Sequence, residues 1–195
     1  MKAMRHLFFL PLLALFASCG GGASTGSVTP EDSAKTAARD AITRIRAQED
    51  SLFSQSVFDR RGALALRDVY LAFAKNNPLD SMAPEYLFRA AGVSHNLGEP
   101  QRTLELYERV IKDYSTWKRL PDTYYLRAFT IENDLGKKGE AQAAYQEVID
   151  RFPGNTFAEQ AAQSIKNLPY SDAELIDRFE KMNAEADKAE AAKTK

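Results

Sequence analysis

The sequence predicts an all-α protein, an α-solenoid of about three helix–turn–helix repeats with capping helices at its ends. The first observation is internal similarity, because residues 86–115 and 124–153 align without gaps at a period of 38 residues. The second is a Leu-Gly pair in the middle of each unit, ending at Gly98 and Gly136, where glycine can end one helix and allow the turn to the next. Repeated helical pairs bury a continuous core only by stacking, so the repeat predicts a solenoid.

The first residues of the chain are typical of an export signal. Two basic residues, Lys2 and Arg5, precede an apolar run at residues 7–16. This run is too short to span a bilayer, because a spanning helix needs roughly 20 apolar residues, and it has the length of the apolar part of a signal peptide. We therefore expect residues 1–18 to be a signal peptide that is removed.

The single cysteine of the chain follows this run. Phe16, Ala17, Ser18 and Cys19 resemble the lipobox of bacterial lipoproteins, in which a hydrophobic residue and two small residues precede a lipidated cysteine. The resemblance implies cleavage before Cys19 and attachment of acyl chains such as palmitate, which hold a protein on a membrane almost permanently. With Gly20 at the next position, it also implies transfer to the outer membrane. The alternative is a free cysteine without lipid.

Residues 19–29 are expected to be the lipidated cysteine and a flexible tether. The stretch GGGASTGSVT, which follows Cys19, has the glycine and serine content of a random-coil linker. A phosphate-binding loop is not expected there, because no strand precedes the glycines and no Gly-Lys-Ser or Gly-Lys-Thr ends them.

Residues 30–168 are expected to form the repeat domain, and its first unit is the weakest. Thr29 can cap a helix that begins at Pro30. The apolar stripe of this N-terminal capping helix consists of Ala38, Ile42 and Ile45. After it, we expect the first helix of the first unit within residues 47–60. The second helix of that unit is indicated by Tyr70, Phe73 and Pro78.

The other two units resemble the tetratricopeptide repeat. This family has a glycine at the turn, an alanine and an aromatic residue in the second helix, and a proline after it. The later unit matches at Gly136, Ala141, Tyr145 and Pro153. The earlier unit keeps Gly98 and Tyr107 but has Thr103 and Ser115 at the other two positions. The period exceeds the family's usual value of about 34 residues, and the extra residues lie mainly in residues 115–122.

Residues 169–195 are expected to be a C-terminal capping helix and a frayed tail. Residues 156–159 and 171–174 both have the capping-box pattern of a helix start. The second box opens a helix that should cover the last repeat. Its apolar face consists of Leu175, Ile176, Phe179 and Met182. Beyond Ala186 no apolar stripe remains, so we expect the end of the chain to fray.

Composition and charge argue against several functions. The formal net charge of −1 is unlike that of nucleic-acid-binding domains, which are usually basic. His95 has no cysteine or histidine partner for a metal site and no marked serine for a catalytic triad, so we interpret it as a polar residue near a helix end. We therefore expect no catalysis, no cofactor and no metal. A pair of carboxylates acting as general acid and base stays open as an alternative.

The repeats and the lipobox together resemble the tetratricopeptide lipoproteins of the bacterial envelope. The nearest comparisons are the accessory lipoprotein of the β-barrel assembly machinery and the Tol-Pal-associated coordinator of cell-wall synthesis. The resemblance implies a scaffold anchored by lipid to the outer membrane, facing the periplasm and binding envelope proteins as an accessory subunit. The alternative is a small-ligand-binding lipoprotein or an enzyme with a carboxylate site in the helical groove. An enclosed cavity with convergent acids would favour that alternative.

The tetratricopeptide pattern implies which first-helix residues face the concave side of the solenoid. They are Glu85, Phe88, Gly92 and Asn96 in one unit, and Thr123, Leu126, Thr130 and Asp134 in the next. Arg89 and Arg127 lie one position further round, where members of the family that bind peptide carboxylates can have a cation. The two arginines could bind an acidic segment bidentately. The alternative for Arg89 is an ordinary ion pair with Glu85, four residues earlier.

Trp117 is the one tryptophan of the chain, and it lies in the lengthened connection between the two clear units. It either fills the gap that the longer connection creates or forms an exposed anchor for a partner, since tryptophan is common at binding hot spots. A soluble fluorescence quencher separates the two alternatives, because it reaches an exposed indole and not a packed one.

Overall fold

The computed structural model describes residues 29–54, 56–169, 176, 180–186, 188 and 190. The predicted signal peptide, the lipobox with Cys19 and nearly all of the tether lie outside these residues, as does the predicted capping box at 171–174. Within the described residues the secondary structure is entirely helical. None of the described helices combines the length and the apolar character that crossing a membrane would require.

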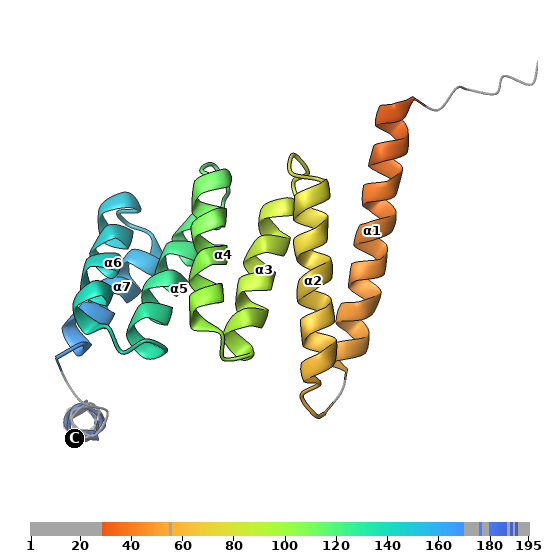
Figure 1. Ribbon diagram of the computed structural model, residues 1–195. Coiled ribbons are helices and arrows are strands. Elements are labelled where there is room, and N and C mark those ends of the chain that lie inside the picture. The colour runs from red at the N-terminus through yellow and green to blue at the C-terminus, as the bar shows by residue number, and fades with distance from the viewer. Residues whose placement is uncertain are drawn as a thin grey trace, which may run out of the picture.

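Seven helices of the described chain follow one another along the solenoid, each running antiparallel to the one before it, and the seventh packs against both the fifth and the sixth (Figure 1). The predicted all-α solenoid is therefore confirmed. The helices are α1 (Pro30–Phe53), α2 (Arg60–Asn76), α3 (Ala83–Asn96), α4 (Pro100–Asp113), α5 (Leu120–Asn133), α6 (Lys138–Arg151) and α7 (Thr156–Asn167). Residues 180–186 are also helical. The two clear units are the pairs α3 with α4 and α5 with α6.

The N-terminal helix begins where the sequence predicts and ends later than predicted. The Thr29 hydroxyl accepts a hydrogen bond of 3.1 Å from the backbone N–H of Asp32, and Pro30 occupies the first turn. The expectation of a separate helix within residues 47–60 is wrong. No glycine or proline interrupts residues 46–53, so α1 continues to Phe53, and the next helix starts only where Asp59 caps it.

The core of the repeats shows how threonine replaces alanine in the earlier unit. Tyr107 and Tyr145 occupy matching positions, and both are buried. Ala141 and Thr103 also match, and both are fully buried. The Thr103 hydroxyl donates a hydrogen bond of 3.0 Å to the backbone carbonyl of Glu99. Because this hydroxyl has a partner, its burial carries little cost.

The turn glycines of both units have positive φ, 74° at Gly98 and 66° at Gly136. Side chains disfavour this region, so Gly136→Ala is expected to lower the free energy of unfolding by about 1 kcal/mol, measured by urea denaturation. Gly139→Ala is the matched control. Gly139 lies inside α6, and a Cβ atom there meets nothing within 4 Å, so this change should stabilise the protein by up to about 1 kcal/mol. Equal effects of the two substitutions on the free energy of unfolding would contradict the positive φ of Gly136 at the turn.

The C-terminal part departs from two expectations. Asn155, and not Thr156, caps α7, because its side-chain oxygen accepts a hydrogen bond of 2.9 Å from the backbone N–H of Phe157. The second departure concerns the predicted lid over the last repeat. Ile176 and Met182, two of its four apolar residues, are 60% and 57% exposed, so these side chains do not cover the repeat.

Candidate functional site

Trp117 is packed rather than free. Its ring contacts Phe88 edge-on, with centroids 5.6 Å apart, and Phe88 in turn contacts Tyr107. The Arg119 guanidinium lies 4.1 Å from the centre of the Phe88 ring. Trp117 is half-buried, as predicted for a residue that fills the gap beside the long connection. Phe88 is partly buried by these neighbours.

Arg127 is not available to a partner. Its side chain is 12% exposed, and its guanidinium forms ion pairs with Glu108 of α4, at 3.0 Å, and with Glu147 of α6. It also lies 5.1 Å from the centre of the Tyr124 ring. Arg127 therefore connects three successive helices, and this arrangement argues against its predicted role as a groove cation.

Arg89 forms the predicted ion pair with Glu85 at 2.8 Å, and a second one with Glu49 of α1 at 2.6 Å. Glu49 also accepts a hydrogen bond of 2.6 Å from the Tyr70 hydroxyl. This network joins α1, α2 and α3. Arg89 is therefore half-exposed, but its guanidinium is engaged in holding these helices together.

The pKa values reflect these networks. Burial alone would raise the pKa of Glu85, but the hydrogen bonds and charges of Arg89 and Arg119 outweigh it and lower the pKa below its ordinary value. Arg127 and Arg151 lower the pKa of Glu147 in the same way, against its burial. These carboxylates therefore stay ionised near neutral pH. They are unsuited to act as general acids there.

The predicted binding of an acidic segment does not fit this arrangement. Each arginine is already bonded to two glutamates. With Arg119 and Asp122 counted, the Arg89 cluster has one more negative than positive charge, whereas Arg151, which pairs with Glu147, makes the Arg127 cluster neutral. An incoming carboxylate would have to displace a glutamate or remain beside it, and like charges in close contact repel. The arginines therefore stabilise the stack instead of recognising an acid.

The concave face of α5 is rotated relative to the prediction. Thr130 and Thr123 are buried, and the Thr130 hydroxyl donates a hydrogen bond of 2.9 Å to the backbone carbonyl of Leu126. Leu126 is half-buried against the core. The neighbouring Phe129 is exposed instead. Thr130 was thus wrongly expected on the surface.

His95 lies in the last turn of α3, as interpreted from the sequence. Its Nδ1 is 2.9 Å from a carboxylate oxygen of Asp134, and its ring packs edge-on against Phe129. Among the residues that the structure describes, no group of three or more His, Cys, Asp or Glu side chains could hold a metal ion.

An open hollow lies between the end of α1 and α3. A hollow of about 300 Å³, here called the α1–α3 groove, is lined by Phe53, Tyr70, Arg89, Gly92, Val93 and Asn96. It continues into a second hollow of about 170 Å³ whose further walls include Val57 and Phe58. Two of the predicted site residues, Arg89 and Asn96, therefore lie together in it. A Cβ atom at Gly92 would meet nothing within 4 Å, so the floor is open.

Three of the groove residues are large apolar side chains in contact with solvent. Phe53, Val57 and Phe58 are 69%, 75% and 60% exposed. Asn96 is also exposed, and its side-chain amide forms no hydrogen bond with any residue in the described part of the chain. Clustered exposed apolar side chains beside a free polar group are typical of interaction sites. Asn96 was among the predicted site residues, whereas Phe53, Val57 and Phe58 were not.

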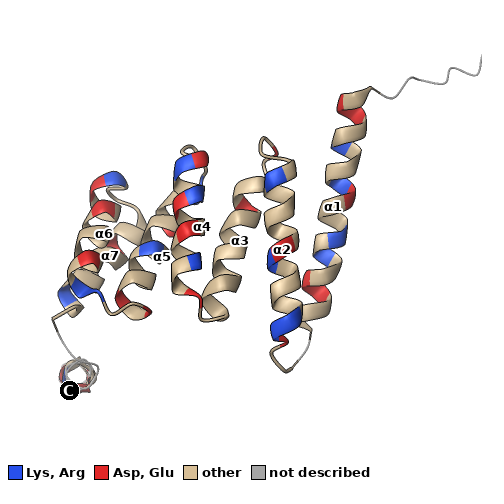
Figure 2. Ribbon diagram, viewed as in Figure 1, with Lys and Arg blue, Asp and Glu red and all other residues tan. Residues whose placement is uncertain are grey.

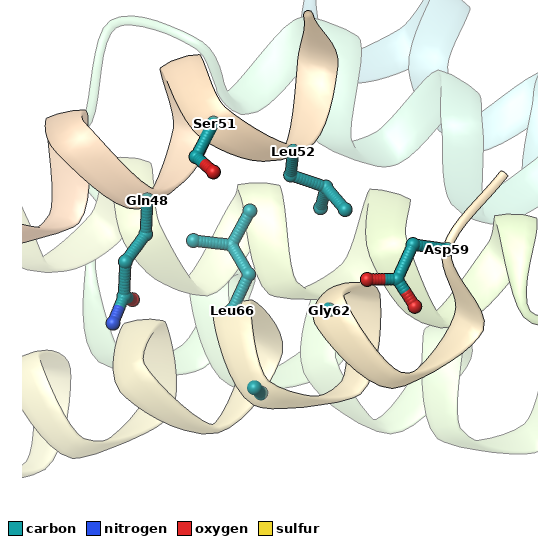
Figure 3. Close-up of a pocket in the computed structure, with 7 residues that line it drawn as sticks. Gln48, Ser51, Leu52, Asp59, Gly62 and Leu66 are labelled. Atoms are coloured by element: carbon teal, nitrogen blue, oxygen red, sulfur yellow. The ribbon is translucent and has the colours of Figure 1, made fainter. Parts of the chain in front are cut away.

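A separate pocket of about 190 Å³ lies between α1 and α2 (Figure 3). Leu52 and Leu66 form its apolar wall, and Asp59 is the one carboxylate among its lining residues. A Cβ atom at Gly62 would come within 2.6 Å of an Asp59 oxygen and 2.8 Å of the Leu52 side chain, so a larger residue there would require these two side chains to shift. With a single carboxylate, the pocket lacks the acid pair that catalysis in a helical groove would need.

Comparison with known proteins identifies the repeat. Residues 122–155 match the model of the tetratricopeptide repeat family. The fold is a solenoid of tetratricopeptide-like repeats. Among solved structures, the crystal structure of MamA is similar, with 19% sequence identity, a TM-score of 0.38 and coverage of 83% of this chain and 98% of that chain. No curated protein matches the chain.

The match fits the geometry of the tetratricopeptide-like solenoid. It covers α5, α6 and the residues before α7, and it contains the four residues on which the resemblance was based: Gly136, Ala141, Tyr145 and Pro153. Solenoids of stacked helical pairs use an extended face formed by successive units to bind partners. The α1–α3 groove lies between the N-terminal helix and the first helix of the α3–α4 unit.

Proposed function

We propose that the protein is a lipid-anchored scaffold of the periplasm that binds a protein segment in the α1–α3 groove, as an accessory subunit of an envelope assembly complex. The anchor rests on the resemblance of residues 16–19 to a lipobox. Binding rests on one observation of the structure, the open apolar groove with the unbonded Asn96 amide. Lipid on Cys19 would place this groove at the periplasmic face of the outer membrane.

The groove favours an apolar peptide segment in extended conformation. Phe53, Val57 and Phe58 offer apolar surface, whose burial contributes roughly 25 cal/mol per Å². The Asn96 amide supplies one donor and one acceptor, which match the N–H and C=O groups of an extended backbone. A helical segment has already used those groups internally. Arg89 is neutralised by Glu49 and Glu85, so an acidic segment gains little there.

Site-specific photo-crosslinking in the native envelope tests the groove. A photoreactive phenylalanine derivative in place of Val57 is expected to give a discrete crosslinked product. The same group in place of Glu105, an exposed residue of α4 outside the groove, should give none. Asn96→Ala should lower the yield at position 57 about tenfold, because lost hydrogen bonds to a partner are worth roughly 1–1.5 kcal/mol.

Two results would contradict the groove as the binding site. One is equal crosslinking at positions 57 and 105, and the other is an unchanged yield in the Asn96→Ala protein with intact helical content. In either case the partner binds another face of the solenoid.

A further inference from the structure

One edge of the solenoid contains both the N-terminus of α1 and two of the connections between helices. Because successive helices are antiparallel, the N-terminus of α1 lies at the same edge as the α2–α3 connection, residues 77–82, and the α4–α5 connection, residues 114–119 (Figure 1). We call these two connections, with the last turns of α2 and α4, the tether edge. The α1–α2 connection with Val57 lies at the opposite edge.

The tether edge exposes an apolar side chain at its tip. Leu79 is 99% exposed, the highest value among the large apolar residues of the described chain. Hollows of about 430 and 370 Å³ lie beside it, and both are lined by Pro78, Leu79 and Tyr114. Trp117 lines the larger one. A single exposed leucine is common on protein surfaces and does not by itself indicate a binding site. The residues around Leu79 are therefore needed to interpret it.

Cations surround this apolar tip. Lys75, Arg109, Lys112 and Lys118 lie on the tether edge, and none of them forms an ion pair among the described residues. Figure 2 shows basic residues at the ends of α2 and α4. Asp113 is exposed, while Asp80 accepts a hydrogen bond of 2.8 Å from the backbone N–H of Met82. The edge therefore has an excess of positive charge.

The length of the preceding chain connects this edge with the anchor. Cys19 and Thr29 are ten positions apart in the chain. A fully extended chain spans at most about 3.6 Å per residue, so the start of α1 stays within roughly 36 Å of Cys19. A lipid on Cys19 would therefore keep the tether edge within reach of the bilayer.

We propose that the tether edge lies on the surface of an anionic membrane, with Leu79 inserted between lipid headgroups and the four cations beside lipid phosphates. Exposed apolar side chains, interfacial tryptophan and clustered lysines and arginines are the features that bind proteins to such surfaces. The orientation rests on the proposed lipid anchor. In this orientation the Val57 end of the α1–α3 groove points away from the membrane, so a periplasmic partner can enter the groove from that end.

Fluorescence of the one tryptophan tests this contact. The chain from residue 19 onward keeps every residue that the structure describes. It is coupled through its only thiol, Cys19, to a maleimide lipid in vesicles of phosphatidylcholine and phosphatidylglycerol that contain brominated phospholipid. Trp117 lies beside the inserted Leu79, so its emission should fall at least twofold relative to vesicles without bromine.

Two matched variants separate the tether edge from other exposed apolar residues. Leu79→Asp should restore most of the emission, because it replaces the inserted side chain by an acid. Val57→Asp changes another exposed apolar residue, at the opposite edge, and should leave the quenching unchanged. Vesicles of phosphatidylcholine alone should give weaker quenching, because the phosphates no longer carry a net charge for the cations to approach.

The proposal is overturned by absent quenching in the unsubstituted protein, by equal effects of the two variants, or by equal quenching in neutral and anionic vesicles. Absent quenching would leave a protein partner as the occupant of the tether edge. Because the maleimide lipid supplies the anchor chemically, these outcomes do not depend on lipidation of Cys19 in the cell. That step is tested separately.

Discussion

The Arg127→Met protein is expected to be less stable than the unsubstituted protein by about 2–3 kcal/mol in urea denaturation. Arg127 is almost completely buried and forms ion pairs with Glu108 and Glu147, so its removal leaves the half-buried Glu147 with Arg151 alone. Breaking a buried pair from one side typically costs 3–5 kcal/mol. The expected loss is smaller, because Glu108 is largely exposed and methionine removes an Nε–H group that has no partner in the described structure.

Arg102→Met is the matched control for this substitution. Arg102 pairs at 2.8 Å with Glu105, three residues later on α4, and both side chains are exposed. Exposed pairs contribute little, so its loss should change the stability by no more than about 0.5 kcal/mol. Equal effects of the two substitutions would show that Arg127 is a surface charge after all, and would return it to the candidates for partner binding.

Cys19→Ser is expected to move the protein from the membrane fraction to the soluble periplasmic fraction almost completely. Serine cannot form the thioether to which the acyl chains are attached, so the proposed anchor is lost. The helical content measured by circular dichroism should be unchanged, because the described helices begin only at Pro30. Fractionation of the envelope followed by immunoblotting measures the distribution.

Ser27→Ala in the same segment is the control and should leave the protein in the membrane fraction. Continued membrane fractionation of the Cys19→Ser protein, with the signal peptide removed, would contradict the lipid anchor. A salt wash then separates two causes, since attachment through the cations of the tether edge is weakened by salt and partner binding in an apolar groove is not.

The helical repeat was predictable because its determinants are local. Gly98 and Gly136 mark turns through their own backbone preference, and Tyr107 and Tyr145 mark the buried face through helical periodicity. The same locality explains the correct prediction for Glu85 and Arg89, which lie one helical turn apart. Patterns of this kind need no knowledge of the neighbouring helices.

The site was harder to predict because it depends on neighbours that are distant in the sequence. Glu49 reaches Arg89 across 40 residues, and no spacing rule connects them. On α5, packing against its neighbours buries Thr130, which the register of the repeat places on the concave face, and leaves the adjacent Phe129 exposed. The sequence pattern does not determine how a helix is rotated about its own axis against its neighbours.

The apolar wall of the α1–α3 groove left a weak signal in the sequence. Phe53, Val57 and Phe58 occur within six residues, and in the structure they surround the end of α1 and the connection to α2. Three large apolar residues at a helix end, outside any helical stripe, would have indicated either a satellite of the core or an exposed patch. Only the structure distinguishes the two.

The scarcity of buried residues at the start of α1 has a mechanical consequence. From Pro30 to Arg44, the first fifteen residues of this helix, Ala38 is the one buried side chain, whereas Ile45 and Glu49 are fixed against the repeats. Tension applied to the chain before Thr29 should therefore peel this part of α1 first and stop at Ile45. Unwinding from about 1.5 to about 3.4 Å per residue releases nearly 30 Å of slack. The first fifteen residues of α1 can thus lengthen under tension while the stacked repeats stay folded.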